Sequence, residues 1–145
     1  MSGTLIEDED AIAAIVRGMR TVAVVGIKGA DRPDEPAHSI PAMLAGLGCE
    51  VTGINPTLSE ALGRPTLPDV GALPASVHVL DVFRRVDAIP ALTDQVLALP
   101  PERRPRTVWL QTGIRHDESA RRLAEAGMNV VQDRCLGVYA RRYAG

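Results

Sequence analysis

Aromatic side chains are scarce in this sequence. Phenylalanine, tryptophan and tyrosine together make up 3% of its 145 residues, so the chain offers no row of rings on which single-stranded nucleic acid could stack. Basic residues are not in excess either. The net charge is −2, which gives no field to attract DNA or an anionic membrane. Neither nucleic acid nor a membrane is therefore expected as a partner.

Cysteine and long apolar runs are also scarce. No apolar segment approaches the roughly 18 to 20 residues that cross a bilayer. Cys49 and Cys135 lie far apart and form no CxxC pair. The acidic segment from Met1 to Asp10 lacks the basic start of a signal peptide. We therefore expect a cytoplasmic protein with reduced thiols.

Apolar residues make up 46% of the chain and fall into alternating strand-like and helix-like segments. Continuous apolar runs predict strands at 21–26, 50–55, 77–83, 107–111 and 128–132, with a short strand near 64–67 and a helical turn near 69–73. Helical periodicity predicts helices at 8–19, 39–47, 87–99 and 117–126, capped by Asp8 or Asp10, Ser39, Asp87 and Asp117. The pattern indicates one α/β domain over residues 1–145, a Rossmann-like, doubly wound parallel sheet of five to six strands with helices on both faces. Residues 1–20 are expected to supply an N-terminal helix that packs on the sheet.

Sheets of this kind bind ligands at the carboxyl ends of their strands. The first strand ends at Gly26, and a loop of about 12 residues separates it from the helix expected at Ser39, longer than the usual βα loop. Gly26 permits close backbone approach, the helix start would offer free N–H groups to an anion, and Lys28 and Arg32 could add positive charge. The alternative is a plain turn with solvated cations. Replacing Gly26 by valine is expected to block the loop and leave the fold intact.

Two further strand ends carry groups that could bind a ligand. Phe83 and Arg84 follow the strand at 77–83, where an adenine or a phosphate could lie. Gln111 and Gly113 follow the strand at 107–111 and offer an amide and a flexible backbone. The simpler interpretation is that Phe83 closes the core and that the polar groups are solvated.

The NAD fingerprint is incomplete. Only Gly26 and Gly29 follow the first strand, and the second strand ends in Asn55 and Pro56 rather than in an acidic residue. An NAD(P)-linked oxidoreductase is therefore the second interpretation. A scaffold with a vestigial nucleotide site is the third.

Several short stretches, taken in order, carry a resemblance: Val24-Val25-Gly26, Asp31-Arg32-Pro33, Ile54-Asn55-Pro56, Asp81-Val82-Phe83-Arg84-Arg85, Trp109-Leu110-Gln111-Thr112-Gly113-Ile114 and Asp133-Arg134-Cys135. With them the chain resembles the small bacterial CoA-binding proteins related to the CoA-binding Rossmann domain of the succinyl-CoA synthetase α subunit. The resemblance implies that coenzyme A, or an acyl-CoA, is held by its ADP end. It implies that Gly26, Ile27, Lys28 and Ser39 meet the phosphates, that Asn55, Pro56, Phe83 and Arg84 flank the nucleotide, and that Gln111, Gly113 and Ile114 line the path to pantetheine.

The chain departs from this family in one residue and in scope. Relatives often carry a basic residue where Thr57 stands, so Lys28, Arg32 or Arg64 would have to replace it or binding would be weak. The synthetase subunit also has a second domain with a phosphorylated histidine, which this sequence lacks. The sequence shows no metal-ligand spacing and no nucleophile–base pair. We therefore expect a sensor, carrier or regulatory module without catalysis of its own, and whether it acts with a protein partner or as a homo-oligomer stays open.

Overall fold

The computed structural model describes residues 3–144 and is built on a five-stranded parallel sheet with the strand order β2-β1-β5-β6-β7. The strands are β1 (Thr21–Val25), β2 (Glu50–Ile54), β5 (Val79–Val82), β6 (Thr107–Leu110) and β7 (Asn129–Val131). Residues of β1, β5 and β6 are almost all buried, because helices cover both sides of the sheet. The predicted Rossmann-like fold is thus confirmed, with five strands in the main sheet.

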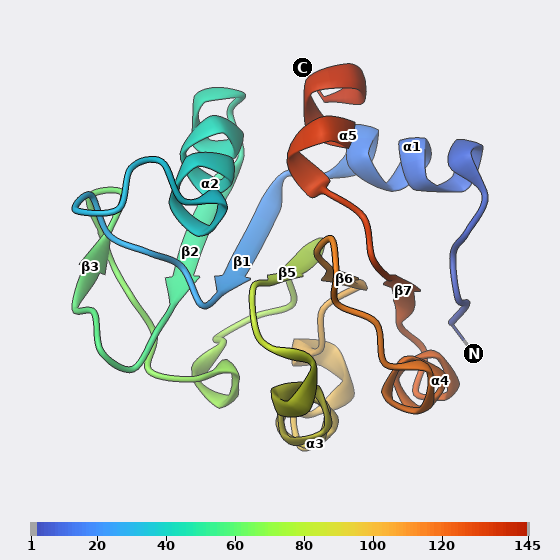
Figure 1. Ribbon diagram of the computed structural model, residues 1–145. Coiled ribbons are helices and arrows are strands. Elements are labelled where there is room, and N and C mark those ends of the chain that lie inside the picture. The colour runs from blue at the N-terminus through green and yellow to red at the C-terminus, as the bar shows by residue number, and fades with distance from the viewer. Residues whose placement is uncertain (1–2, 145) are drawn as a thin grey trace.

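Helices cover the sheet in two layers (Figure 1). One face carries α1 (Glu9–Gly18), α2 (Pro36–Gly46) and α5 (Leu136–Tyr143), and the other carries α3 (Ile89–Leu97) and α4 (Asp117–Glu125). On the first face Ile12 and Val16 of α1 share a buried apolar cluster with Trp109 of β6. Helix α1 therefore packs on this face of the sheet.

The strand order creates a crevice between β1 and β5. From β1 the chain passes to α2 on one face, and from β5 it passes to α3 on the other face (Figure 1). The two connections therefore diverge where the carboxyl ends of these neighbouring strands meet. In open parallel sheets this divergence opens a binding crevice.

Helix α2 begins three residues earlier than the sequence predicts. It starts at Pro36 after the N-cap residue Glu35, so the expected start at Ser39 is wrong. Proline suits the first turn of a helix because its missing N–H is not needed there. Pro41, deeper in α2, has no N–H to offer the carbonyl group four residues back, and the oxygen of Ala37 instead accepts the N–H of Lys28 at 3.0 Å. That bond ties the loop after β1 to α2.

Of the four predicted helix caps, one is confirmed and three are wrong, the N-cap of α2 being Glu35 rather than Ser39. Asp8 caps α1, where its Oδ2 accepts the N–H of Ala11 at 2.9 Å. Asp87 does not cap α3, because it lies in a short 3-10 helix (Val86–Ala88) and its carboxylate pairs with Arg85 at 3.3 Å. Helix α4 is capped by His116 rather than Asp117, through an N–H from Ser119 to Nδ1 of the ring at 3.2 Å.

Three pieces of local structure lie outside the sequence prediction: β3, a 3-10 helix and α5. The expected strand near 64–67 is present as β4 (Arg64–Pro65), but it forms a hairpin with β3 (Glu60–Ala61), which was not predicted. The expected helical turn near 69–73 is a 3-10 helix at Val70–Ala72, and a further one spans Pro101–Arg103. Helix α5 was not predicted at all. Within residues 3–144, no helix has the length and apolar character to cross a membrane.

Candidate functional site

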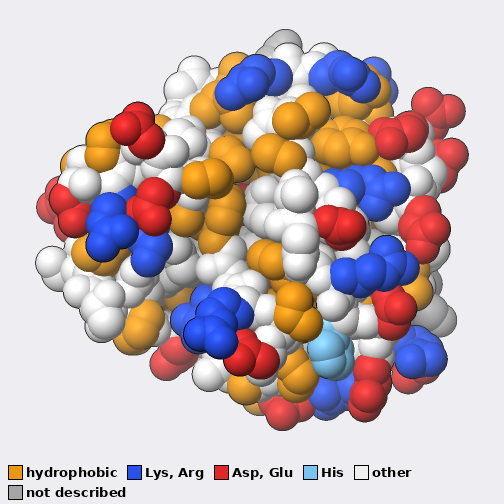
Figure 2. Space-filling view, viewed as in Figure 1, with side chains coloured by type: hydrophobic (Ala, Val, Ile, Leu, Met, Phe, Trp, Pro, Cys, Tyr) orange, Lys and Arg blue, Asp and Glu red, His pale blue; other side chains and the backbone are white. Residues whose placement is uncertain are grey.

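The main cleft has a volume of about 510 Å³ and lies where β1, β2 and β5 end. Figure 2 looks onto this edge of the sheet, where hydrophobic side chains lie among uncharged atoms near the centre and basic side chains lie beside them. The lining residues come from the first turns and loops after those strands and from the start of α2. They are Gly26, Lys28, Ala37, Asn55, Pro56, Thr57, Phe83, Arg84, Arg85, Asp87 and Ala88.

Gly26 lets the backbones of β1 and β5 approach at the floor of this cleft. Its φ is +85°, and a Cβ placed on it would lie 2.3 Å from the carbonyl oxygen of Phe83. Its N–H donates to the carbonyl oxygen of Ile54 at 2.9 Å. A side chain here would therefore collide with the backbone of the neighbouring strand. The expectation that Gly26→Val blocks the loop and spares the fold has to be corrected, because the change strains the sheet itself.

Asn55 shapes the wall of the main cleft by bonding within the protein. Its Nδ2 donates to the carbonyl oxygen of Ile27 at 2.8 Å, and its Oδ1 accepts both the N–H and the hydroxyl of Thr57 at 2.8 Å each. The side chain thus holds the loops after β1 and β2 together. The hydroxyl of Thr57 is used in this bond.

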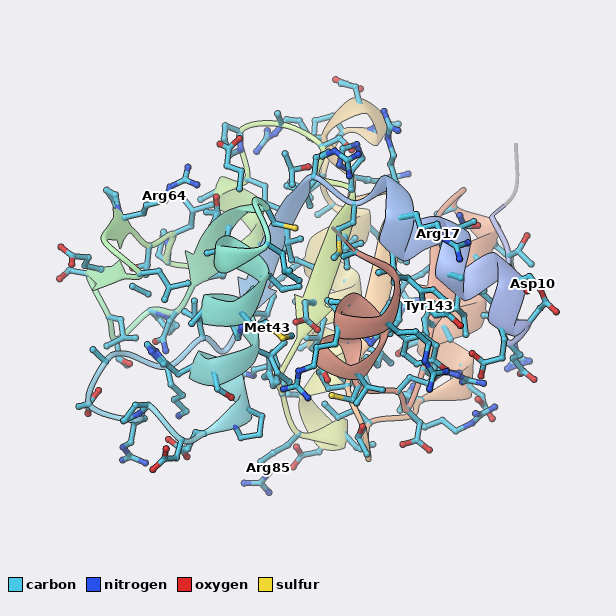
Figure 3. All side chains as sticks on the ribbon, turned by 90° about the horizontal axis from the view of Figure 1, so that it is seen from above. Asp10, Arg17, Met43, Arg64, Arg85 and Tyr143 are labelled. Atoms are coloured by element: carbon cyan, nitrogen blue, oxygen red, sulfur yellow. The ribbon has the colours of Figure 1, made fainter. Side chains whose placement is uncertain are left out.

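Three cations surround the main cleft. Lys28 has its backbone N–H anchored on Ala37, so its side chain starts from a fixed point. Within residues 3–144, neither Lys28 nor Arg84 forms an ion pair. Arg85 pairs with Asp87 and projects outward from this edge of the molecule (Figure 3). The cleft is therefore suited to a ligand that carries several negative charges.

Two more clefts adjoin the main one, and Arg84 lines all three. The second has a volume of about 360 Å³ and is lined by Val25, Ile54, Pro56, Pro68, Asp69, Val70, Arg84, Ala88, Ala91, Leu92 and Gln95. The third has a volume of about 460 Å³ and is lined by Pro36, Ile40, Phe83, Arg84, Arg85, Gln111, Thr112, Ile114 and Cys135. Together they form a row along the carboxyl edge of the sheet, with the cations in the middle and apolar walls on either side.

A buried acid stands behind the third cleft. Asp81 of β5 is completely buried, and its Oδ1 lies 2.5 Å from Nε2 of Gln111. Burial raises the pKa of Asp81 to about 7, and the hydrogen bond from Gln111 opposes that rise. The other end of the Gln111 amide, Oε1, lies 3.4 Å from the backbone nitrogen of Leu136, the first residue of α5. Gln111 therefore connects β5 and α5 at the wall of the cleft.

Comparison with known proteins assigns a family to this arrangement. Residues 20–141 match the family model described as CoA binding domain. The chain belongs to this family. It is 30% identical over 127 residues, which is 88% of this chain and 90% of the relative, to the Bacillus subtilis (strain 168) protein described as uncharacterized protein YneT.

Solved structures share the fold of this CoA-binding domain. Cell-free ID.343 from Thermus thermophilus has 38% sequence identity and a TM-score of 0.84, with 94% of this chain and 98% of that chain covered. A dinucleotide-forming acetyl-coenzyme A synthetase from Ca. Korarchaeum cryptofilum, in complex with phosphate and ADP, has 23% identity and a TM-score of 0.66. The match covers 82% of this chain and 26% of the synthetase chain, so the shared part is one unit of a larger protein.

The CoA-binding domain brings most of the residues predicted from the sequence to the row of clefts. The main cleft holds Gly26, Lys28, Asn55, Pro56, Phe83 and Arg84, and the third cleft holds Gln111 and Ile114 with Phe83 and Arg84. Four predicted residues line none of the three clefts: Ile27, Arg32, Ser39 and Gly113.

Each of those four has another role in the structure. Ile27 is completely buried in the core. Arg32 pairs with Glu35 at 3.2 Å and with Asp31 at 3.9 Å. Ser39 is inside α2. Gly113 turns the loop after β6 with a φ of +84°.

Sequence reasoning missed several residues of the clefts. Ala37 was missed because the start of α2 was placed too late, although Pro36 signalled the earlier start. Cys135 lines the third cleft, although the sequence indicates no more than a reduced thiol there. The second cleft was missed because most of its walls are short apolar side chains, which carry no signal of a site.

Proposed function

We propose that this chain binds coenzyme A, or an acyl-CoA, along the row of three clefts. The observation that carries the proposal is the arrangement itself, in which a cationic cleft at Gly26 and Arg84 opens on both sides into clefts with apolar walls. Coenzyme A has the matching order of parts, a nucleotide, a diphosphate and a long pantetheine arm. Membership of the CoA binding domain family supports this ligand.

The diphosphate belongs in the main cleft. Lys28, Arg84 and Arg85 supply positive charge there, and Ala37 brings the N-terminal end of α2 to the wall. The dipole and a free N–H group of a helix start stabilise an anion by about 0.3 to 1 kcal/mol. In the first turn of α2, Pro36 has no N–H and the N–H of His38 donates to Glu35, so the dipole and the N–H of Ala37 supply this effect. Because Thr57 adds no charge, we assign the compensating cations to Lys28 and Arg84.

The nucleotide and the arm take the two flanking clefts. Val25, Ile54 and Leu92 in the second cleft offer apolar surface to an adenine ring. Ile40, Phe83 and Ile114 in the third offer apolar surface to the pantetheine arm. Burial of such ligand surface contributes roughly 25 cal/mol for each Å² removed from water.

The cations, the loop and helix amides and the apolar side chains around the clefts suit retention of a ligand, and Asp69, Asp87 and Cys135 line the clefts as well. We therefore extend the proposal to a cytoplasmic sensor, carrier or regulatory module. The acetyl-coenzyme A synthetase with the same fold carries it as about a quarter of a longer chain. By analogy, the present chain would supply the binding step alone.

Calorimetric titration with coenzyme A, acetyl-CoA, NAD, NADP and ADP tests the ligand. The variant Arg84→Glu is compared with Arg121→Glu. The second variant reverses an exposed charge on α4, which lies on the face of the sheet opposite to α2 and away from the three clefts. We expect CoA species to bind the native chain, and Arg84→Glu to weaken them at least about tenfold because a charge-assisted contact is replaced by repulsion. Arg121→Glu should bind as the native chain does.

Other outcomes would change the proposal in defined ways. Binding of NAD or NADP without CoA would indicate an oxidoreductase. Binding of none of the five ligands would indicate a scaffold. Equal loss of affinity in both arginine variants would place the ligand elsewhere.

A further inference from the structure

Asp81 is a buried acid with one oxygen that has no hydrogen-bond partner in the described part of the chain. It lies in the middle of the sheet, opposite Val24 of β1 and Trp109 of β6, and is completely buried. Its Oδ1 is bonded to Gln111, while its Oδ2 has no hydrogen-bond partner among residues 3–144. A buried polar atom without a partner is costly, so its presence calls for a reason.

Gln111 lies between Asp81 and the third cleft. One end of its amide faces Asp81 at 2.5 Å, and the other end lies 3.4 Å from the backbone nitrogen of Leu136. Gln111 also lines the third cleft, beside Thr112 and Cys135. The protonation of Asp81 can therefore decide which atom of the amide is available at the wall of the cleft.

Three arrangements of this pair are available. If Asp81 is ionised and accepts a hydrogen bond from Nε2, a negative charge is buried in the core and Oδ2 has no hydrogen-bond partner. A proton on Oδ2 leaves a buried O–H group with no acceptor. A proton on Oδ1 can instead be donated to the oxygen of Gln111 once the amide is turned over. A spacing of 2.5 Å suits such an O–H···O bond and is short for N–H···O. The turned amide then presents its NH₂ group on the side of Leu136 and the cleft, and the N–H of Leu136, which donates to Oε1 at 3.4 Å before the turn, loses that acceptor.

We propose that Asp81 is a positioning residue, which in its protonated form turns the amide of Gln111 so that its NH₂ group donates a hydrogen bond to a carbonyl oxygen of the ligand's arm in the third cleft. This inference rests on the proposed function. The carbonyl oxygen is either an amide oxygen of pantetheine or the thioester oxygen of an acyl group. Ionisation of Asp81 returns the NH₂ group to the carboxylate and withdraws the donor.

The protonation of Asp81 depends on its burial and on its hydrogen bond with Gln111, and not on a charged neighbour. The strand residues opposite it are Val24 and Trp109, which are not ionisable. On the face of α1, α2 and α5, the titratable and charged groups are Glu9, Asp10, Arg17, His38, Tyr139, Arg141, Arg142 and Tyr143, with Cys135 just before α5. The pKa of Asp81 is raised by burial and lowered by the Gln111 bond, with none of those groups contributing.

The test measures affinity against pH for three ligands. Calorimetry at pH 6 and pH 8, on either side of the Asp81 pKa of about 7, compares coenzyme A, acetyl-CoA and 3′-phospho-ADP, which has no arm. The nucleotide is needed as a reference because the ligand phosphate itself titrates near pH 6. Relative to the nucleotide, we expect CoA species to bind about fivefold more tightly at pH 6, the effect of one net hydrogen bond.

Two variants distinguish a role of Asp81 in orienting the Gln111 amide from a purely structural role. In Asp81→Asn the new amide can donate to Gln111 at every pH, so the affinity for CoA should stay at its pH 6 level. In Gln111→Met, which has similar length and no donor, the affinity should stay at the pH 8 level. If coenzyme A already shows the full pH effect without an acyl group, the pantetheine amide accepts the bond. If only acetyl-CoA shows it, the thioester oxygen does.

A carboxyl ¹³C titration of Asp81 gives a second readout that needs no variant. A ligand that prefers the protonated form must raise the pKa of Asp81 when it binds, because the linkage is reciprocal. An unchanged pKa, or identical pH profiles for the native chain and Asp81→Asn, would overturn the inference while CoA binding stands. Failure of both CoA and 3′-phospho-ADP to bind the native chain would instead remove the proposed function.

Discussion

The carboxyl group of Asp81 also affects the stability of the free protein. Its folded pKa is about 7, against an ordinary value of 3.8. Between these two values the folded chain holds a proton that the unfolded chain has lost. The contribution of Asp81 to stability is therefore greatest below about pH 4, falls as the pH rises through this window, and is constant above pH 7.

Asp81→Asn removes this dependence. Relative to the variant, the native chain should lose about 3 kcal/mol of unfolding free energy between pH 5 and pH 8, since each unit of pKa shift is worth 1.36 kcal/mol. Urea denaturation of both proteins at the two pH values measures the difference. Other titrating groups cancel in the comparison, so parallel curves would mean that Asp81 is ionised throughout.

Substitutions at Gly26 and Gly48 allow the stability cost of backbone strain to be separated from that of a steric clash. Both have positive φ, +85° and +97°, but a Cβ on Gly48 meets nothing within 4 Å, whereas one on Gly26 meets a carbonyl oxygen at 2.3 Å. Gly48→Ala should cost about 1 kcal/mol from backbone strain alone. Gly26→Ala should cost at least about 2 kcal/mol more, measured by denaturant unfolding. Equal losses would show that the strands move apart easily at the floor of the main cleft.

At the residue level the sequence predicted residues of the main cleft where the backbone decides their place. Gly26, Asn55 and Phe83 follow directly from the ends of strands, and parallel strands end at one edge. Arg32 could not be placed in this way, because its ion pair with Glu35 depends on the path of a loop. The bond between Asp81 and Gln111 joins residues 30 positions apart in the sequence, and only the register of β5 and β6 brings them together.

Helix α5 shows why one element escaped prediction. It follows β7 after a few residues and includes Gly137 in its first turn, which lowers intrinsic helix propensity. Its stability comes from packing, since Leu136 and Ala140 are completely buried against the sheet. A Cβ on Gly137 would lie 3.0 Å from Ile40 and 3.3 Å from Met43 of α2, whose side chain Figure 3 shows between the two helices. Tertiary contact, rather than local sequence, determines this helix.

Substitutions of one glycine in α5 and one in α1 should change the stability of the fold in opposite directions. Gly137→Leu should destabilise the fold by about 1 to 3 kcal/mol, because α2 and α5 would have to separate. A Cβ on Gly18, the last residue of α1, would meet nothing within 4 Å. Gly18→Ala should therefore stabilise by about 0.5 to 1 kcal/mol. Thermal unfolding of both variants measures this, and a neutral Gly137→Leu would show that the two helices are not closely packed.

Across the whole molecule the two edges of the sheet differ in what they can bind. The net charge of the chain is −2, yet Lys28, Arg84 and Arg85 stand together at the carboxyl edge. The amino edge has its own cleft, of about 440 Å³, beside Arg17 and Tyr143 on α1 and α5, labelled in Figure 3. Within residues 3–144, the carboxyl edge combines cations with two adjoining apolar clefts, so we expect a long anionic ligand to bind there.

Hydrogen exchange with coenzyme A and ADP as ligands tests this assignment. At 100 times its dissociation constant, a ligand adds about 2.7 kcal/mol to global stability, so core amides that exchange through unfolding should slow by about a hundredfold. Beyond this shared effect, coenzyme A should protect the loops at 26–35, 83–88 and 111–116. ADP should protect the first two and leave 111–116 unchanged, because it has no arm to enter the third cleft. Protection confined to 17–20 and 47–49 would place the ligand at the amino edge. Equal protection of 111–116 by both ligands would reverse the order of nucleotide and arm along the row.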